Sequence, residues 1–542
     1  MRFVLLLLAF VVLVPLASAA SSIDLLSVSQ DEQRLGGIAT AQLEVRPGSG
    51  AVFIDSFPLT RLDTQISTRF AREYACQLAE EDCSRKDFFY TLRTSSSVIG
   101  GPSAGAAITV LTYAELKGLP IDQSAVMTGT VNSGGLVGPV GGIEEKVEAA
   151  REAGYERVLV PAFEDPAEVE GIEVIPVVDV EEAIWHFTGS DVRSVPGEIA
   201  VPDAYRSQMQ EVATFLCERA DSLGDSVGNV SSAAQEFLSR SASAAGRTDF
   251  YSAASFCFSA NLRLQEQYLS SKSQSDLRSI SRQLREDIEL FDADLSEQDV
   301  SSIADLEVMM VVRERLVESF DRLQEVDMDN VSSSTLALSL ERFVSARAWS
   351  SFFGQVPSRE LDVSDRRLQM SCSQKVIEAQ ERLNYVQFLL DESLVDTQEV
   401  VSNALEDQRQ EEWALCLFKA TKAKAEADSV ITAVYSGSNL NQTVTRLRSK
   451  AQSVLSSQTA RGDFPIISYA YYEYSGSVDD VFSSNLYASY ALELANLDIY
   501  FPEPARSGLY VDSEKVVVLV AGLVIGLVGG LLAADLYRRR KK

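Results

Sequence analysis

The chain of 542 residues is too long for one ordinary hydrophobic core, so we expect two or three domains. Its formal net charge of -30 argues against a nucleic-acid-binding protein, because such proteins need a basic surface. With a single histidine and no C-x-x-C motif, a zinc site has almost no support, and we expect no metal and no other cofactor.

The N-terminus has the pattern of a secretory signal peptide. Arg2 supplies one positive charge, an apolar run follows from Phe3 to Leu16, and the small residues 17–19 (ASA) end the segment. The run is short for a membrane span, which favours cleavage after Ala19 over an uncleaved N-terminal anchor. We therefore predict that residues 1–19 are a signal peptide and that the chain after them is exported.

Short strands and helices alternate over residues 22–190 and predict a mixed α/β domain. The predicted strands have β-branched and aromatic residues and lie at 39–46, 51–54, 87–93, 125–130 and 156–160. The first predicted helix has one apolar face, made by residues that recur every four positions, namely Leu62, Ile66, Phe70 and Tyr74. Two more helices are predicted at 103–117, ending at Gly118, and at 143–153.

Beyond Pro202 glycine and proline become scarce, and the composition favours helices. Residues 203–460 predict a helical bundle, as in 274–291, where leucines and isoleucines form an apolar stripe. Residues 461–513 are rich in tyrosine and are interpreted as a segment close to a membrane.

The C-terminus has the pattern of a membrane anchor. Residues 516–534 carry no charge and are long enough to cross a bilayer as a helix, so we predict a transmembrane helix over 515–537. The basic residues 538–542 that follow predict a cytoplasmic tail. Together with the signal peptide, this pattern predicts a single-pass protein of the cell membrane whose N-terminal domains are extracellular.

The six cysteines are an even number, and in an exported chain pairing is the default. Two of them flank a short acidic loop and are the first expected bridge, Cys76 with Cys83. The other four lie in the helical region, where the expected bridges are Cys217 with Cys257 and Cys372 with Cys416. Free buried cysteines are the alternative.

The first motif with chemical meaning is residues 101–105 (GPSAG). Here glycines flank Ser103 at a helix start, where the hydroxyl can be exposed and unpaired backbone N–H groups can stabilise an oxyanion. Alone, such a motif is more often a turn and a helix cap. It also satisfies G-x-S-x-G, but the hydrolases with that motif need a later histidine, for which only His186 is present. Because residues 94–97 (TSSS) precede it instead of a buried strand, we rank that alternative second.

The second motif is residues 128–130 (TGT) followed by 136–146 (LVGPVGGIEEK). Three features in this order resemble the proteolytic domain of Lon proteases. They are the serine of GPSAG, the T-G strand, and the glycine pair followed four residues later by a lysine. The separation of Ser103 from Lys146 also agrees with that family. The resemblance covers residues 22–190 and implies an α/β (α+β) fold for them.

The resemblance implies that Ser103 is the nucleophile, Lys146 the general base and Thr128 a partner that orients the lysine. A serine hydroxyl needs a base to take its proton. An ammonium cannot be that base, so Lys146 must be kept neutral by burial, for which Ile143 and Val147 are suitable neighbours. The alternative is a solvated helix lysine, favoured by the nearby Glu144, Glu145 and Glu148.

The sequence departs from the family in three places. Many Lon domains have an aspartate where Gly100 stands, and some have histidines on the preceding strand, here 87–93, which has none. These departures put the polarity of the cleft and the substrate preference in doubt. The sequence also has no G-x-x-x-x-G-K-[ST] motif and therefore no sign of the ATPase module.

From these features we expect an ATP-independent serine endopeptidase that cleaves unfolded or flexible proteins and peptides outside the cytoplasm. The family's enzymes form rings, so we expect a homo-oligomer, helped by Gly522 and Gly526 in the predicted membrane helix. The helical region is expected to select substrates, such that deleting 203–460 could change preference without stopping peptide hydrolysis. The competing hypothesis is a surface interaction or scaffold protein whose Lon-like domain is inactive or only processes itself.

Overall fold

The computed structural model describes residues 21–501, apart from short gaps at 30–34, 58, 95–99, 164–168 and 194–195, and a few positions near the C-terminus. The predicted signal peptide, 1–19, lies outside the described residues. The chain divides into one compact unit over 1–502 and a second over 503–542, and each is described by itself.

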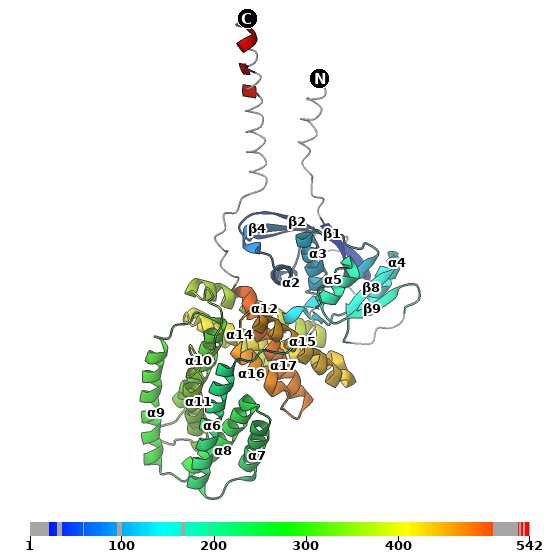
Figure 1. The fold of residues 1–542 in the computed structure, drawn as a ribbon. Helices are drawn as coiled ribbons and strands as arrows, with labels where there is room; N and C mark the ends of the chain where they lie inside the picture. The colour runs from blue at the N-terminus through cyan, green and yellow to red at the C-terminus, as the bar shows by residue number, and fades with distance from the viewer. Residues whose placement is uncertain are drawn as a thin grey trace. The chain divides into compact units, whose positions relative to one another are not determined.

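The first part of the compact unit is an α/β domain built on a seven-stranded sheet (Figure 1). In sheet order the strands are β3 (Val52–Phe57), β4 (Lys86–Thr94), β2 (Gly36–Pro47), β1 (Ser21–Val28), β5 (Ala125–Met127), β8 (Arg157–Pro161) and β9 (Glu173–Val177). The β1–β2 and β2–β4 pairs are antiparallel and the other pairs are parallel. A separate antiparallel hairpin consists of β6 (Thr130–Val131) and β7 (Val137–Gly138).

The α-helices described in this domain are α2 (Leu62–Leu78), α3 (Gly105–Lys117), α4 (Ile143–Glu152) and α5 (Val180–Thr188). Helix α3 is buried along its first ten residues because it packs between the sheet and the helices α2 and α5. It ends at Gly118, whose φ of 63° is a left-handed conformation that glycine adopts without strain.

The α/β prediction is confirmed for this domain, with two local differences. Helix α3 begins at Gly105 and not at Ser103, because residues 103 and 104 form the turn that leads into it. The strand expected over 125–130 is interrupted, since β5 ends at Met127 and β6 belongs to the separate hairpin.

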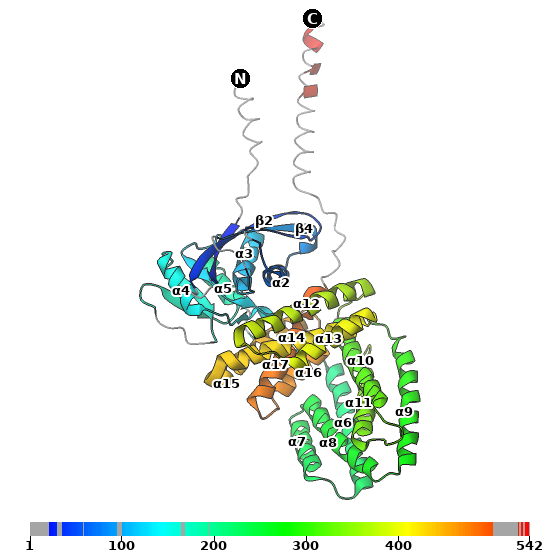
Figure 2. The ribbon, with the colours of Figure 1, turned by 180° about the vertical axis from the view of Figure 1, so that it is seen from behind.

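The second part of the compact unit is helical, as predicted (Figure 2). Its helices are α6 (Asp203–Val227), α7 (Ser232–Gly246), α8 (Phe250–Ser270), α9 (Gln274–Leu295), α10 (Ile303–Gln324), α11 (Ser333–Ser350), α12 (Asp365–Leu390), α13 (Val395–Arg409), α14 (Trp413–Ser436), α15 (Leu440–Ala460), α16 (Ile466–Ser475) and α17 (Val481–Ala495), followed by the short helix η4 (Asn496–Tyr500). The tyrosine-rich stretch after residue 460 is part of this body. Its Tyr471 and Tyr490 are buried, with ring centroids 5.4 Å apart, because α16 and α17 pack against each other.

The three predicted disulfides are confirmed. Cys76–Cys83 ties the end of α2 to the loop before β4. Cys217–Cys257 joins α6 to α8, and Cys372–Cys416 joins α12 to α14. All six cysteines are therefore paired, and the alternative of free buried cysteines is wrong.

The prediction of one C-terminal transmembrane helix is contradicted. Among the residues that the structure describes, no helix is both long and apolar enough to span a bilayer. Most of the predicted span, 515–537, lies outside those residues. An apolar run is a necessary condition for a span and does not by itself establish one. The predicted single-pass membrane location, with a cytoplasmic tail at 538–542, is corrected with it.

Candidate active site

Ser103 lies in the turn that leads into α3, and its side chain is half-buried. The glycines of the GPSAG motif have backbone roles there. Gly101 has φ of 96°, where other residues are strained. At Gly105 a Cβ would lie 2.6 Å from Ser67 Oγ and 2.9 Å from Val131 Cγ1, so only glycine allows the start of α3 to pack this closely.

Helix α2 supports this turn with two side-chain hydrogen bonds. The Thr64 hydroxyl donates to the Gly101 carbonyl at 3.2 Å, and the Ser67 hydroxyl donates to the Pro102 carbonyl at 3.3 Å. The Pro102 carbonyl also accepts from Gly105 N–H at 3.0 Å, so this turn is held by backbone and side-chain hydrogen bonds together. The turn that presents Ser103 is thus fixed by its own domain.

Thr128 and Gly129 follow β5 and connect the sheet to the Ser103 turn. Thr128 N–H donates to the Leu159 carbonyl of β8 at 3.0 Å, which continues the sheet by one residue. Gly129 N–H donates to the Ser103 carbonyl at 2.8 Å, and its own carbonyl accepts from Ala106 N–H at 3.1 Å. The T-G pair thus places the Thr128 side chain beside the Ser103 turn.

Lys146 lies in the first turns of α4, which begins after Gly142. Its side chain is only 3 % exposed, and Nζ donates to Thr128 Oγ1 at 3.1 Å. Thr128 Oγ1 in turn donates to the Ser103 carbonyl at 3.4 Å. The structure therefore brings together all three residues that the sequence singled out, in a hydrogen-bonded chain that ends on the Ser103 backbone carbonyl.

The surroundings of Lys146 disfavour its charged form. Burial lowers the pKa of Lys146 to about 7, against the opposing effect of the Glu145 carboxylate. Val147 is buried in the adjoining apolar cluster, and Ile143 packs against it. The alternative of a solvated helix lysine is wrong, because Glu144 and Glu148 are exposed on the helix while Lys146 points inward.

His186, the histidine of the second-ranked hydrolase interpretation, lies elsewhere in the domain. It is on α5, with its ring 4.6 Å from that of Trp185. The surface hollow around it is lined by residues 120–122, Arg157 and 185–189, and Ser103 is not part of that lining. The structure does not pair His186 with the serine.

Sequence reasoning missed the role of the hairpin between Thr128 and Lys146. Its tip is formed by Gly134 and Gly135, both with positive φ (68° and 75°), and neither has room for a side chain. The glycine pair in 132–135 (NSGG) is the signal that could have drawn attention to a tightly packed turn.

Comparison with known proteins agrees with this geometry. Residues 67–186 match the family model of the Lon protease (S16) C-terminal proteolytic domain, a range that includes Ser103, Thr128 and Lys146. The chain is 33% identical over 127 residues to the archaeal Lon protease of Methanocaldococcus jannaschii, covering 23% of this chain and 20% of that protein. It is 38% identical over 111 residues to the archaeal Lon protease of Archaeoglobus fulgidus, covering 19% and 18% of the two chains.

A bacterial relative matches over a shorter range. Lon protease 2 of Bacillus subtilis is 36% identical over 89 residues, which is 16% of each chain. The chain therefore spans about a fifth of the length, or less, of these curated relatives, and the similarity concerns the domain that carries the serine and the lysine.

Proposed function

Residues 67–186 form a proteolytic domain of the Lon family, and from this premise we propose that the protein is a serine-type endopeptidase with a Ser103–Lys146 dyad. The observation that carries the proposal is the state of Lys146. Its amine is buried, its pKa is lowered to about 7 by that burial, and it donates a hydrogen bond to the Thr128 hydroxyl. Such an amine is available as a base near neutral pH.

In the proposed reaction the neutral Lys146 amine takes the hydroxyl proton of Ser103 while the serine oxygen attacks the carbonyl carbon of a peptide bond. The C–N bond then breaks, and the ammonium returns the proton to the leaving amine. A water molecule, deprotonated by the same lysine, releases the acyl group from the serine. Thr128 orients the amine throughout, and backbone N–H groups of the turn at 103–104 would stabilise the developing oxyanion.

We extend the proposal to the substrate and to the absence of an energy source. The sequence has no phosphate-binding G-x-x-x-x-G-K-[ST] motif, and a helical region follows the peptidase domain. Without a motor, a substrate must reach Ser103 by its own local unfolding. Cleavage should then fall about tenfold for every 1.4 kcal/mol of substrate stability, which favours unfolded or flexible proteins and peptides. The expected homo-oligomer stays a prediction.

The test is hydrolysis of a fluorogenic peptide and of casein by the purified protein, compared with three variants. Ser103→Ala and Lys146→Arg should each lose activity on the order of a thousandfold or more, since a guanidinium cannot act as a base. Ser281→Ala, at a buried serine on α9, is the matched control and should keep full activity. Near-normal turnover by either dyad variant would show that its residue is wrongly assigned. A large stimulation by ATP and magnesium would contradict the energy-independent part of the proposal.

A further inference from the structure

The segment that joins Thr128 to Lys146 is a hairpin, and its contacts extend into the helical region. Both ends of this segment are in the candidate site, where Lys146 Nζ and Thr128 Oγ1 are 3.1 Å apart. Between them lie β6, a tight turn at 133–135, β7 and the Gly141-Gly142 pair. Because the two ends share a hydrogen bond, whatever holds the hairpin also sets the geometry of that bond.

The tip of the hairpin is inserted between helices. A Cβ on Gly134 would lie 2.7 Å from Leu492 Cδ1 of α17, and a Cβ on Gly135 would lie 2.5 Å from the hydroxyl of Tyr74 on α2. Gly134 N–H also donates to the Asn496 side chain at 3.4 Å. The tip therefore contacts both parts of the compact unit and leaves no free volume at either glycine.

Helix α12 holds the two arms of the hairpin. The Arg382 guanidinium, 3 % exposed, donates to Asn132 Oδ1 in the first arm. One turn further along α12, the Tyr385 hydroxyl donates to the Pro139 carbonyl in the second arm at 3.2 Å. A Cβ on Gly141 would also contact Leu389 of α12, at 3.5 Å. Helix α12 thus lies along the hairpin, and its contacts extend to the glycine pair just before α4, the helix that carries Lys146.

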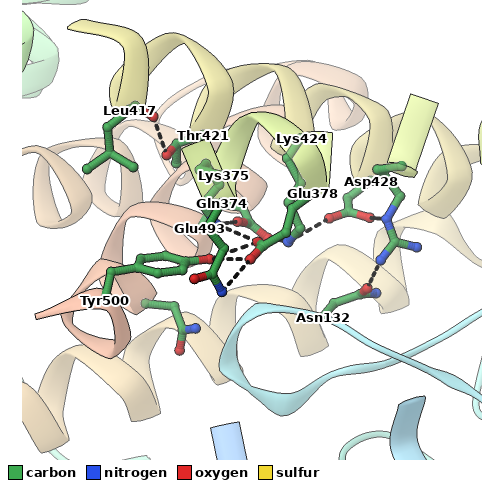
Figure 3. Close-up of polar contacts among 12 residues, drawn as sticks. Asn132, Gln374, Lys375, Glu378, Leu417, Thr421, Lys424, Asp428, Glu493 and Tyr500 are labelled. Carbon is green, nitrogen blue, oxygen red and sulfur yellow. Dashed lines mark hydrogen bonds and ion pairs between the residues drawn. The ribbon is translucent and has the colours of Figure 1, made fainter. Parts of the chain in front are cut away.

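Arg382 also contacts a buried ionic cluster, whose members Lys375, Glu378, Lys424, Asp428 and Glu493 are labelled in Figure 3. Arg382 Nε is 3.0 Å from Asp428 Oδ1 on α14, and Lys424 also pairs with Asp428, at 3.7 Å. Lys424 and Lys375 both bind Glu493 of α17. The cluster is completed by Glu378, which accepts from Lys375 at 3.3 Å and from the Tyr500 hydroxyl at 2.8 Å.

Three cations (Lys375, Lys424, Arg382) face three carboxylates (Glu378, Asp428, Glu493) in this cluster, and the carboxyl of Glu381, whose pKa burial raises to about 7, lies beside Arg382. Removing one member of a buried ionic network leaves an uncompensated charge and is strongly unfavourable, so the members hold one another in a single arrangement. The ionic cluster, whose members lie on α12, α14 and α17, therefore holds Arg382 in position to donate to Asn132.

We propose that Arg382 and Tyr385 are positioning residues for the peptidase reaction, acting through the hairpin on the Thr128–Lys146 pair. The α/β domain and the helical region then work as one catalytic unit. This inference rests on the proposed function and opposes the expectation that residues 203–460 can be deleted with peptide hydrolysis intact. Neither residue touches the reacting atoms; each fixes the segment that carries the base.

The test uses the full chain and the double variant Asn132→Ala with Tyr385→Phe, which removes both polar contacts but leaves the ionic cluster paired. We expect kcat for a fluorogenic peptide to fall about tenfold, as for the loss of a buried hydrogen bond to a charged group, with KM within about twofold of wild type. A looser hairpin should let water reach Lys146, which favours the charged amine and raises its pKa. The acid limb of the plot of kcat against pH should therefore move to higher pH. Asn132→Asp keeps an acceptor for Arg382 and should retain activity.

The matched control is Tyr490→Phe, which removes a buried hydroxyl that bonds Glu426 within the helical region and does not touch the hairpin. A loss of stability alone would lower activity equally at all pH values and leave the midpoint of the acid limb unchanged. If the double variant behaves in this way, or like the control, the positioning role is refuted.

Hydrogen–deuterium exchange separates this inference from the proposed function. In a Ser103→Ala background, the amides of residues 130–146 should exchange faster in the double variant than in the Tyr490→Phe control. Equal exchange would overturn the inference. If the wild-type protein hydrolysed no peptide, the proposed function would fail and the positioning role with it, whereas equal exchange alongside an active wild type would overturn the positioning role alone.

Discussion

Replacing Lys146 with methionine should stabilise the folded protein while it abolishes catalysis. Methionine has a similar length and volume but no charge, so it suits the apolar pocket. The buried amine, by contrast, is held where its charged form is disfavoured, which lowers its pKa to about 7. A site that keeps a base neutral for catalysis is therefore expected to reduce the stability of the fold.

The magnitude follows from the two pKa values. A tenfold change in a protonation equilibrium is about 1.4 kcal/mol, so lowering the pKa of Lys146 from 10.5 to about 7 corresponds to about 5 kcal/mol. Below about pH 7 the folded and unfolded chains both bind the proton, and the cost is present in full. As the pH rises from 7 to 10.5, only the unfolded chain keeps the proton, and the cost declines to zero. After about 1 kcal/mol is deducted for the lost bond to Thr128, the gain in stability should be about 4 kcal/mol at pH 6 and about 1 kcal/mol at pH 9.

Lys375 provides a control with the opposite sign. It is equally buried, and burial alone would lower its pKa, but the carboxylates of Glu493 and Glu378 and the Tyr500 hydroxyl outweigh this and hold the pKa well above its usual value. Lys375→Met should therefore lose about 4 kcal/mol, because it leaves buried carboxylates uncompensated. The loss should be present at both pH values.

The assay is urea denaturation of wild type and both variants at pH 6 and pH 9, followed by circular dichroism. The expected order of stability at pH 6 is Lys146→Met above wild type above Lys375→Met. The reasoning is refuted if Lys146→Met is less stable than wild type at pH 6, or if its advantage is the same at both pH values.

Two further predictions concern the packing of the fold. Gly134→Ala should lower the free energy of unfolding by more than about 2 kcal/mol, because residue 134 has a positive φ and the new Cβ would make a close contact. Gly118 also has a positive φ but has open space around it, so Gly118→Ala should lower the free energy of unfolding by about 1 kcal/mol. Equal losses in denaturation would contradict the tight insertion of the hairpin tip. Replacing Cys217 and Cys257 by alanine opens a loop of 40 residues and should lower the free energy of unfolding by about 4 kcal/mol. An unchanged unfolding midpoint after that replacement would refute this estimate.

The sequence alone predicted the features that depend on residues close together in the chain. Apolar periodicity located α2, and a glycine in a left-handed conformation marks the end of α3 where the sequence placed it. The disulfide partners also followed from their proximity and the even cysteine count. The motif's spacings singled out Ser103, Thr128 and Lys146 as the candidate site, whose roles stay a prediction, and the structure links Lys146 through Thr128 to the Ser103 carbonyl.

Local sequence patterns were misleading where the conclusion depended on the three-dimensional structure of the segment. The uncharged run near the C-terminus predicted a membrane span, and no described helix is long and apolar enough to be one. The glutamates around Lys146 suggested a solvated lysine as an alternative, but helix geometry turns them outward and the lysine inward.

Only the tertiary structure decided how the base is held and what surrounds it. The protonation of Lys146 depends on how many atoms of other elements exclude water from it, and a single sequence does not record that burial. Arg382 and Asn132 are 250 residues apart in the chain, so no spacing or periodicity relates them, and the contact arises only when the helices of the second part fold against the hairpin. For that reason the sequence pointed to the three candidate site residues, whereas the contacts that support their geometry became visible only in the packed structure.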